Sequence, residues 1–187
     1  ATSAYWQLLT NRNSRIRELK QLDDKMVAMT RYSVTDMLAD HVVDSAKLKS
    51  ERVFKVQIND VNVRLQMMQN NEMDAMFVTE PQATLARLSK HKLLLDTRKL
   101  DWNMGVIAFR EKPMNDVDRK RQYDVFVKAY NQACDSINKN GIAHYAHLME
   151  KYCRTRREAI DSIPKTKFHH AVGPREKDMM LAEKYTK

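Results

Sequence analysis

Residues 59–81 have the sequence NDVNVRLQMMQNNEMDAMFVTEP, and this stretch decides the fold. An apolar pattern with helical spacing begins at Val61 and ends at Asn70. Residues 75–78 form a short apolar run, which is typical of a buried strand. Pro81 suits the first turn of a helix, because its φ is already helical and its missing N–H would have no partner there. Helix, turn, buried strand and helix start together predict half of a βαβ unit, with a polar corner after the strand.

The alternation of strands and helices extends over residues 5–101. The apolar runs predict strands at 5–10, 25–30, 52–58, 75–78 and 92–95. Helical spacing predicts helices from Ser33, where Asp36 three residues on would complete a capping box, from Asp60, and over 81–90. A β-α-β-α-β-α-β series with short links requires right-handed crossovers, so we expect an α/β fold with a parallel sheet.

The pattern changes after residue 101. A strand is predicted at 102–109, in which Gly105 permits a bend or a close approach of two chain segments. Only helices follow: over 118–139 with Gly141 as the stop signal, over 142–152, from Thr155 with Glu158 in a capping box, and a short one from Pro174.

Composition narrows the function classes. The 187 residues can bury one or two modest cores, and 43% apolar with 30% charged residues indicates a globular protein. No apolar run approaches the roughly 18 residues of a membrane span. The net charge of +9 comes mostly from the ends, since residues 1–22 carry four basic and one acidic group and residues 151–187 carry ten and five. No basic stripe is interleaved with aromatic residues, so we expect a solvated basic periphery and no nucleic-acid partner.

Two short motifs resemble the periplasmic solute-binding proteins of ABC importers, in the group that binds sulfonates, nitrate and thiamine precursors. NEMDA at residues 71–75, followed by Glu80-Pro81, is similar to the family's "gly/asn-glu-x-asp-ala" turn and its "glu-pro" strand end. IRELKQLDDKMVAMTRYS at 16–33 is similar to the family's entry to the second lobe. This chain departs from the pattern with Asp24 in place of a turn Gly, which Asp can replace, and with Tyr32 in place of a small residue.

The resemblance implies a two-lobed, parallel-sheet fold of the periplasmic-binding-protein type. Residues 25–98 would form a complete α/β ligand-binding lobe, and residues 1–24 with 99–187 a partial first lobe of crossing strands and C-terminal helices. The family's first lobe begins with further β-α-β-α-β residues, so we expect this chain to be a processed or truncated product. The resemblance also implies a periplasmic or cell-envelope protein whose lipid anchor is removed. The implied partners of this protein are a small-molecule ligand and the ABC permease subunits.

Ligands of open parallel sheets bind beyond the carboxyl ends of the strands, where helix N-termini offer N–H groups. Three such corners follow the predicted strands: Thr30-Arg31-Tyr32-Ser33, Asn59-Asp60 and Thr79-Glu80. We expect them to share one edge of the sheet and to contact the ligand, with Trp102 and Asn103 covering it where the chain crosses between lobes. The alternatives are that each capping residue only satisfies its own helix and that Trp102 only packs a hinge. The charge of the ligand stays open, because Arg31 and the helix N-termini favour an anion whereas Asp60 and Glu80 favour an amine or a ring N–H.

Other chemistries lack a motif. No nucleophile is paired with a base, so we expect no enzyme activity, and we expect no cofactor. His144 and His147, with the pair His169-His170, have no further ligand at recognisable spacing, so we expect no metal site. Cys134 and Cys153 lie on apolar helix stripes as buried thiols, and a disulfide between them stays an alternative.

Two other functions fit the same resemblance. One is the effector-sensing domain of a LysR-type transcription regulator, which would need a helix-turn-helix before the sensor. The other is a thiamine-pyrimidine-precursor synthase, which needs a lysine for pyridoxal phosphate and histidines that would fall mostly outside this chain.

Overall fold

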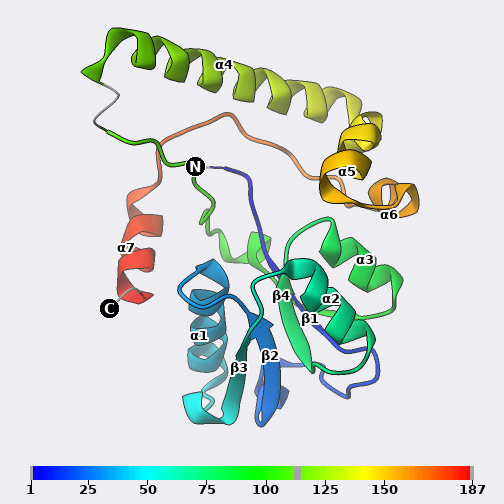
Figure 1. Ribbon diagram of the computed structural model, residues 1–187. Coiled ribbons are helices and arrows are strands. Elements are labelled where there is room, and N and C mark those ends of the chain that lie inside the picture. The colour runs from blue at the N-terminus through cyan, green and yellow to red at the C-terminus, as the bar shows by residue number, and fades with distance from the viewer. Residues whose placement is uncertain (1, 112–114, 186–187) are drawn as a thin grey trace. The chain divides into compact units, whose positions relative to one another are not determined.

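Five strands between Gln7 and Asp96 form one mixed sheet (Figure 1). The structure is a computed structural model that describes residues 2–111 and 115–185. The strands lie in the spatial order β3-β2-β4-β1-β5, with the bounds β1 Gln7–Thr10, β2 Lys25–Met29, β3 Val53–Gln57, β4 Ala75–Val78 and β5 Lys92–Asp96. β2 is parallel to β3 and β4, as the sequence predicts, whereas β1 lies between β4 and β5 and runs antiparallel to both. Position and direction of β1 were not predicted, because no crossover helix joins β1 to its neighbours.

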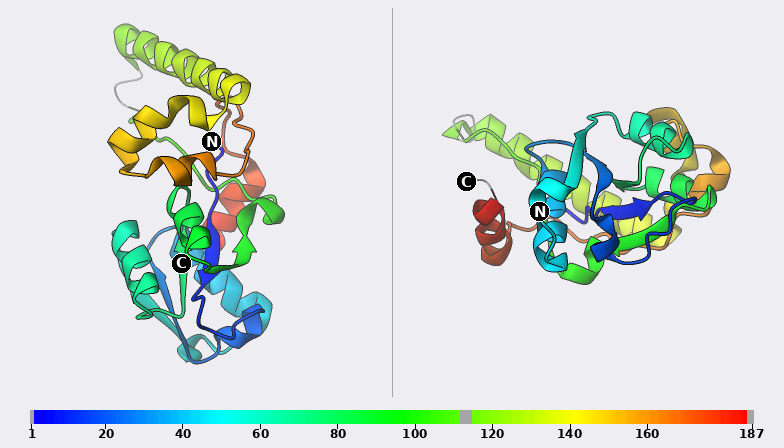
Figure 2. Two further views of the ribbon diagram at one scale, coloured as in Figure 1. Left: turned by 90° about the vertical axis from the view of Figure 1, so that its right-hand side faces the viewer. Right: turned by 90° about the horizontal axis from the view of Figure 1, so that it is seen from below.

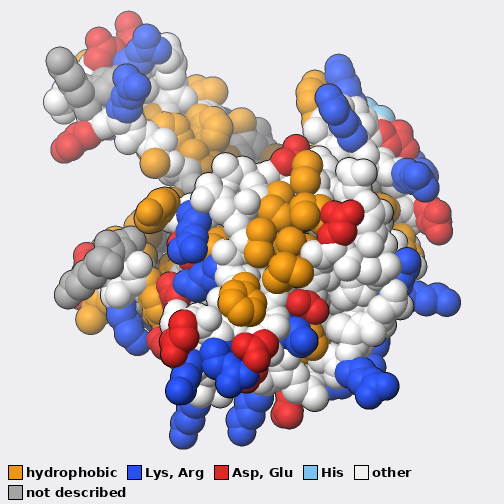
Figure 3. Space-filling model, turned by 60° about the horizontal axis from the view of Figure 1, so that its bottom comes forward, with side chains coloured by type: hydrophobic (Ala, Val, Ile, Leu, Met, Phe, Trp, Pro, Cys, Tyr) orange, Lys and Arg blue, Asp and Glu red, His pale blue; other side chains and the backbone are white. Residues whose placement is uncertain are grey.

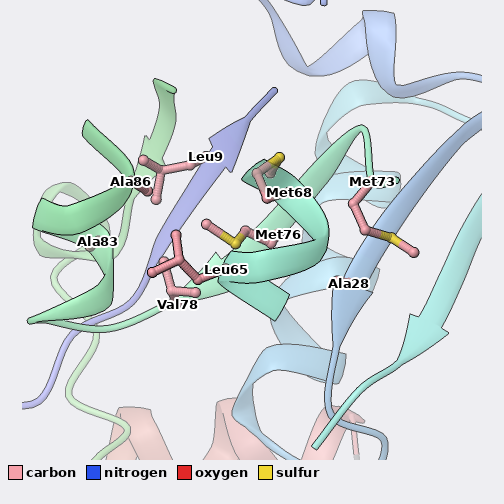
Figure 4. Close-up of a cluster of buried hydrophobic side chains, with 9 residues drawn as sticks. All are labelled: Leu9, Ala28, Leu65, Met68, Met73, Met76, Val78, Ala83 and Ala86. Carbon is pink, nitrogen blue, oxygen red and sulfur yellow. The ribbon is translucent and has the colours of Figure 1, made fainter. Parts of the chain in front are cut away.

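Helices cover both faces of this sheet. α1 (Val34–Ala46) packs on one face, and α2 (Val61–Gln69) and α3 (Gln82–Leu88) pack on the other (Figure 1). Figure 4 shows the core on the α2 and α3 side, where helix and strand side chains meet: Leu9, Ala28, Leu65, Met68, Met73, Met76, Val78, Ala83 and Ala86. Because side chains alternate along a strand, the face toward α1 receives the other buried strand residues, which include Leu8, Val27, Met29 and Phe77.

Left-handed backbone at turns explains two features of the family motifs. Asp24, where the family has Gly, has φ +56°, and Asn71 in the NEMDA turn has φ +65°. Asp and Asn tolerate this region better than most residues, because their short polar side chains bond to the local backbone. The replacement of Gly by Asp at position 24 therefore keeps the turn, as predicted.

The chain divides into two compact units, one of residues 5–102 with 179–187 and one of residues 1–4 with 103–178. The second unit contains α4 (Val117–Asn140), which is one unbroken helix in Figures 1 and 2, followed by α5 (Ala146–Cys153) and α6 (Arg157–Asp161). α7 (Glu176–Tyr185) contains the boundary between the units. Short 3-10 turns occur at Leu19–Leu22, Ser50–Arg52, Thr97–Leu100 and Ile142–Tyr145. The division into a complete lobe of residues 25–98 and a partial first lobe of residues 1–24 and 99–187 stays a prediction.

Two local predictions in the second unit are wrong. Residues 102–109 form no strand, because a strand needs a neighbour and, among the described residues, only Thr2 offers a backbone bond, to the Gly105 oxygen at 2.7 Å. Thr155 does not begin a helix through a capping box: its hydroxyl donates to the Cys153 oxygen at 3.1 Å, and α6 starts after Arg156.

Two other predictions in this unit are confirmed. Gly105 is a point of close approach, since a Cβ there would lie 2.3 Å from the Thr2 Oγ1 atom and 2.6 Å from the Ala4 Cβ atom. Gly141 ends α4 with φ +80°, in the left-handed region.

The surface shows no continuous basic band on the face drawn in Figure 3, where Lys and Arg lie among Asp and Glu. This agrees with a solvated distribution of the net charge of +9. Within residues 2–111 and 115–185, none of the helices is long and apolar enough to cross a membrane.

Candidate functional site

The three predicted corners follow strands that end level with one another. Met29 pairs with Gln57 in the β2–β3 register, and Ala28 pairs with Met76 in the β2–β4 register. Thr30, Asn59 and Thr79 therefore all lie just beyond the carboxyl end of this parallel part of the sheet. The shared edge that the sequence predicts is present, whereas ligand binding by its residues stays a prediction.

A buried arginine, Arg64 of α2, joins the three strand ends. Its Nε donates to the Ile58 oxygen at 2.6 Å after β3, and its Nη1 donates to the Phe77 oxygen at 2.7 Å in β4. Its Nη2 donates to the hydroxyl of Thr30 after β2. Arg64 is only 2% exposed, and burial lowers the pKa of its guanidinium although the charge of Asp60 opposes this.

Arg64 was missed in the sequence analysis. The signal was its position, since Arg64 lies three residues after Val61 and four before Met68, on the apolar stripe of the helix. A charged residue on such a stripe is rarely fully buried unless it is paired or hydrogen-bonded, so it indicates a specific set of partners.

The corner before α1 combines a helix cap with an exposed aromatic residue. The Ser33 hydroxyl donates to the Thr30 oxygen at 2.7 Å and accepts from the Thr35 N–H at 3.2 Å. Asp36 accepts from the Tyr32 N–H at 3.0 Å, one residue before the position that a capping box predicts. The Tyr32 backbone has φ +56°, and the residue is 100% exposed. Arg31 is also exposed and makes no hydrogen bond or ion pair with the described residues.

The corner before α2 is a second helix cap. Asp60 Oδ1 accepts from the Asn62 N–H at 2.7 Å and from the Val63 N–H at 3.4 Å. Asn59 is exposed, and its Oδ1 accepts from the Gln57 side chain at 3.4 Å. Asp60 is therefore engaged by its own helix.

The corner before α3 is tied to the protein through Glu80. One carboxylate oxygen accepts from the Thr84 N–H at 2.9 Å, and the other forms an ion pair with Arg87 Nη2 at 2.8 Å. Arg87 also donates to the side chains of Gln7 and Thr84. The peptide bond between Glu80 and Pro81 is cis, and Pro81 is the N-cap residue of α3. Both Glu80 oxygens thus have partners within the protein.

The two remaining predicted site residues belong to different units. The Trp102 ring packs edge-on against His41 of α1, with ring centroids 4.5 Å apart. Asn103 belongs to the unit of residues 1–4 and 103–178, where its N–H donates to Asp178 Oδ1 at 3.3 Å.

A cavity of about 240 Å³ lies within the unit of residues 1–4 and 103–178. Aromatic side chains line much of it, among them Phe109, Tyr123, Phe126 and Tyr130, and none of the predicted site residues does. Among the described residues, no three His, Cys, Asp or Glu side chains are placed to hold a metal ion. Cys134 is buried, Cys153 is half-buried, and both are free thiols.

This sheet order, with its level strand ends and its helices on both faces, defines an α/β fold of the periplasmic-binding-protein type, as predicted. The aliphatic sulphonate binding protein SsuA of Escherichia coli has a similar structure, with a TM-score of 0.74 and 17% identity over 96% of this chain and 57% of that one. The alkanesulfonate-binding SsuA of Xanthomonas axonopodis pv. citri, bound to MOPS, has a TM-score of 0.74 and 14% identity over 96% and 61%. The desulfurization enzyme DSZB has a TM-score of 0.61 and 12% identity over 96% and 67%.

No protein-family model and no curated protein sequence matches the chain. At identities of 12% to 17%, the similarity establishes the fold alone. The chain spans 57% to 61% of the length of the two sulfonate-binding proteins.

Proposed function

We propose that this chain is part of a solute-binding component of an ABC-type importer, which captures a small polar organic molecule between two lobes and delivers it to a membrane permease. The observation that carries the proposal is the shared edge, where three strand ends and the N-termini of α1 and α2 come together. Helix N-termini at such an edge offer N–H groups to a ligand. The similarity of this fold to that of two sulfonate-binding proteins supports the same function.

The proposed ligand-binding residues are those that the sequence predicts: Thr30, Arg31, Tyr32, Ser33, Asn59, Asp60, Thr79, Glu80, Trp102 and Asn103. Arg31 and Tyr32 have the exposed side chains for direct contact, a guanidinium for an oxyanion and a ring for stacking. Glu80, whose two oxygens both have partners, and Asp60, whose Oδ1 accepts from two helix N–H groups, act by holding the helix N-termini in place.

An anion is the preferred ligand class in this proposal, with a sulfonate as first candidate. Arg31 and the two helix N-termini favour a negative charge, whereas the Glu80 carboxylate is already paired with Arg87 and Asp60 Oδ1 already accepts from its own helix. The SsuA proteins are sulfonate-binding by description, and one holds MOPS, itself a sulfonate. A thiamine precursor is the second candidate.

The mechanism is a closure of two lobes without a chemical step, so we propose no enzyme activity and no cofactor. Contacts from both lobes select the closed state, which presents the protein to the permease. A periplasmic or cell-envelope location, with a lipid anchor, belongs to the same proposal. The LysR-type sensor and the precursor synthase have no observation in their favour.

A screen by thermal shift and calorimetry tests the proposal on the 187-residue chain. The panel contains alkanesulfonates, thiamine precursors, amino acids and nitrate. We expect binding by sulfonates that is weaker than micromolar, because the chain spans only 57% to 61% of the length of the two sulfonate-binding proteins. Micromolar affinity would contradict that expectation, and a panel without any binding member would contradict the proposed function.

Two exposed arginines provide a matched pair of variants. Arg31 lies at the proposed edge, whereas Arg15 lies in the loop after β1, which leads away from it. Arg31→Ala should weaken sulfonate binding by about ten- to hundredfold, since a hydrogen bond to a charged group contributes about 1.5–3 kcal/mol. Arg15→Ala should leave binding unchanged, and an equal loss in both variants would indicate nonspecific charge attraction.

A further inference from the structure

We propose that Arg64 is a positioning residue that fixes the three corners of the edge relative to one another. This inference rests on the proposed function of that edge as a ligand-binding site. Arg64 would touch no ligand itself, because its residue is 2% exposed and its three donor nitrogens point to protein oxygens.

The three acceptors of Arg64 come from different strand ends. Thr30 follows β2, Ile58 follows β3, and Phe77 lies in β4 next to its last residue. These acceptors are 34, 6 and 13 residues away from Arg64 along the chain. The parallel ladders end at the pairs Met29–Gln57 and Ala28–Met76, so the guanidinium cross-links the three chain segments just beyond the last ladder bonds.

The link continues from Thr30 to the cap of α1. The Thr30 oxygen accepts from the Ser33 hydroxyl at 2.7 Å, and the Thr30 N–H donates to Thr35 Oγ1 at 2.9 Å. A shift of Thr30 would therefore move the cap on which Arg31 and Tyr32 are presented. Asp60, the cap of α2, lies two residues after Ile58, and Thr79 lies two residues after Phe77. Each corner is thus at most three residues from an Arg64 partner.

Only arginine has the geometry for this role. Its guanidinium carries five N–H donors in a rigid planar fork, whereas the lysine ammonium is a single compact centre on a flexible stem. Among the described residues, no carboxylate lies within ion-pair distance of Arg64, so its partners are neutral oxygens. A lysine at this position would keep the positive charge but would not hold the three neutral oxygens at fixed positions. A comparison of arginine with lysine therefore distinguishes positioning by hydrogen bonds from the effect of charge.

The test compares Arg64→Lys and Arg64→Met with Arg52→Met, by hydrogen exchange of backbone amides. Arg52 is a matched control because its guanidinium also cross-links the chain, to Asp23 and Asp24, but at the opposite ends of β2 and β3. Both Arg64 variants should raise exchange in all three segments 30–33, 58–61 and 77–80 by about tenfold or more. Arg52→Met should raise exchange only near residues 23–26 and 51–54.

Three outcomes would overturn the proposal. Amide exchange in Arg64→Lys could be as slow as in the wild-type chain, it could increase in only one of the three corners, or it could increase uniformly over the whole sheet. If Arg64→Met fails to fold, Thr30→Val tests the same link with Arg64 retained. That variant removes only the hydroxyl that accepts from Nη2, so exchange should rise in 30–33 and stay unchanged in 77–80. Unchanged amide exchange in residues 30–33 of Thr30→Val would also overturn the proposal.

Ligand affinity separates this inference from the proposed function. If the wild-type chain binds a sulfonate, Arg64→Lys should weaken that binding by about tenfold although the charge is kept. Unchanged affinity with loosened corners would refute the link between Arg64 and the ligand. If the wild-type chain binds no ligand, the proposed function fails, and the exchange pattern still decides whether Arg64 positions the corners.

Discussion

Asn11 provides a sharp test of how the NEMDA turn is held. Asn11 is 5% exposed, and its amide nitrogen donates to the Met68 oxygen at 3.0 Å and to the Met73 oxygen at 3.1 Å. Its Oδ1 accepts from the Asn13 N–H at 2.9 Å. Asn11 thus ties the loop after β1 to the end of α2 and to the residue before Asp74. Asn11→Ala removes all three side-chain bonds.

The expected loss follows from these three bonds. A typical hydrogen bond contributes about 1 kcal/mol net, and a buried carbonyl without a partner costs about 1–3 kcal/mol. In this variant the Met68 oxygen keeps a bond from the Asn71 N–H at 3.2 Å. The main loss of stability should therefore come from the Met73 oxygen, which loses its bond from Asn11. We expect the free energy of unfolding to fall by about 2–4 kcal/mol in Asn11→Ala.

Urea unfolding followed by tryptophan fluorescence measures this loss. The two tryptophans, Trp6 and Trp102, both belong to the unit that contains the sheet, so the signal reports that unit. With a urea slope of about 1–3 kcal/mol per molar, a loss of about 2–4 kcal/mol should lower the midpoint by about 0.7–4 M. Asn13→Ala is the control, because Asn13 is exposed and its side chain donates only to Asn71, so this substitution should cost less than about 0.5 kcal/mol. Equal losses of unfolding free energy in Asn11→Ala and Asn13→Ala would show that the buried bonds of Asn11 do not stabilise the turn more than an exposed bond does.

Two further predictions concern a buried histidine and a close approach of two segments. His91 is 4% exposed, and burial, together with the charge of Arg12, lowers the pKa of its ring below 6.5. The unfolded chain therefore binds the proton more readily, so the stabilisation is complete above the unfolded pKa and is lost as pH falls through the lowered folded pKa. Urea midpoints between about pH 7 and about pH 5.5 should fall less in His91→Gln than in wild type, and parallel slopes would contradict this. Gly105→Ala places a Cβ 2.3 Å from Thr2 Oγ1, whereas a Cβ at Gly173 meets nothing within 4 Å. Protease cleavage near residues 2–4 should accelerate in Gly105→Ala and stay unchanged in Gly173→Ala; equal rates would show that the approach is not tight.

Local signals predicted much of the edge. Ser33 and Asp60 both cap helices, because each side chain accepts from a nearby backbone N–H, and Pro81 stands at the start of α3, where its missing N–H leaves no donor unpaired. The level ends of β2, β3 and β4 followed from the rule that short crossovers make parallel strands. Such features depend on neighbours within a few residues or on general topology.

The features that were missed depend on distant partners. The insertion of β1 between β4 and β5 requires pairing with residues more than sixty positions away. The segment 102–109 has the composition of a strand, yet strand formation depends on a neighbour that composition does not reveal. Arg64 stood on a helix stripe, but its partners lie in three separate segments, so the sequence could indicate only that such partners exist. Whether Tyr32 stacks on a ligand also depends on a partner outside the chain.

Whether the three corners bind one ligand can be tested by a nuclear magnetic resonance titration of the 15N-labelled chain with MOPS. We expect the amide signals of seven corner residues to shift together along one binding curve, because the three corners share one edge: Arg31, Tyr32, Ser33, Asn59, Asp60, Thr79 and Glu80. Shifts that are confined to a single corner, or that fall at the amino ends of β2 and β3 near Asp24 and Arg52, would contradict it.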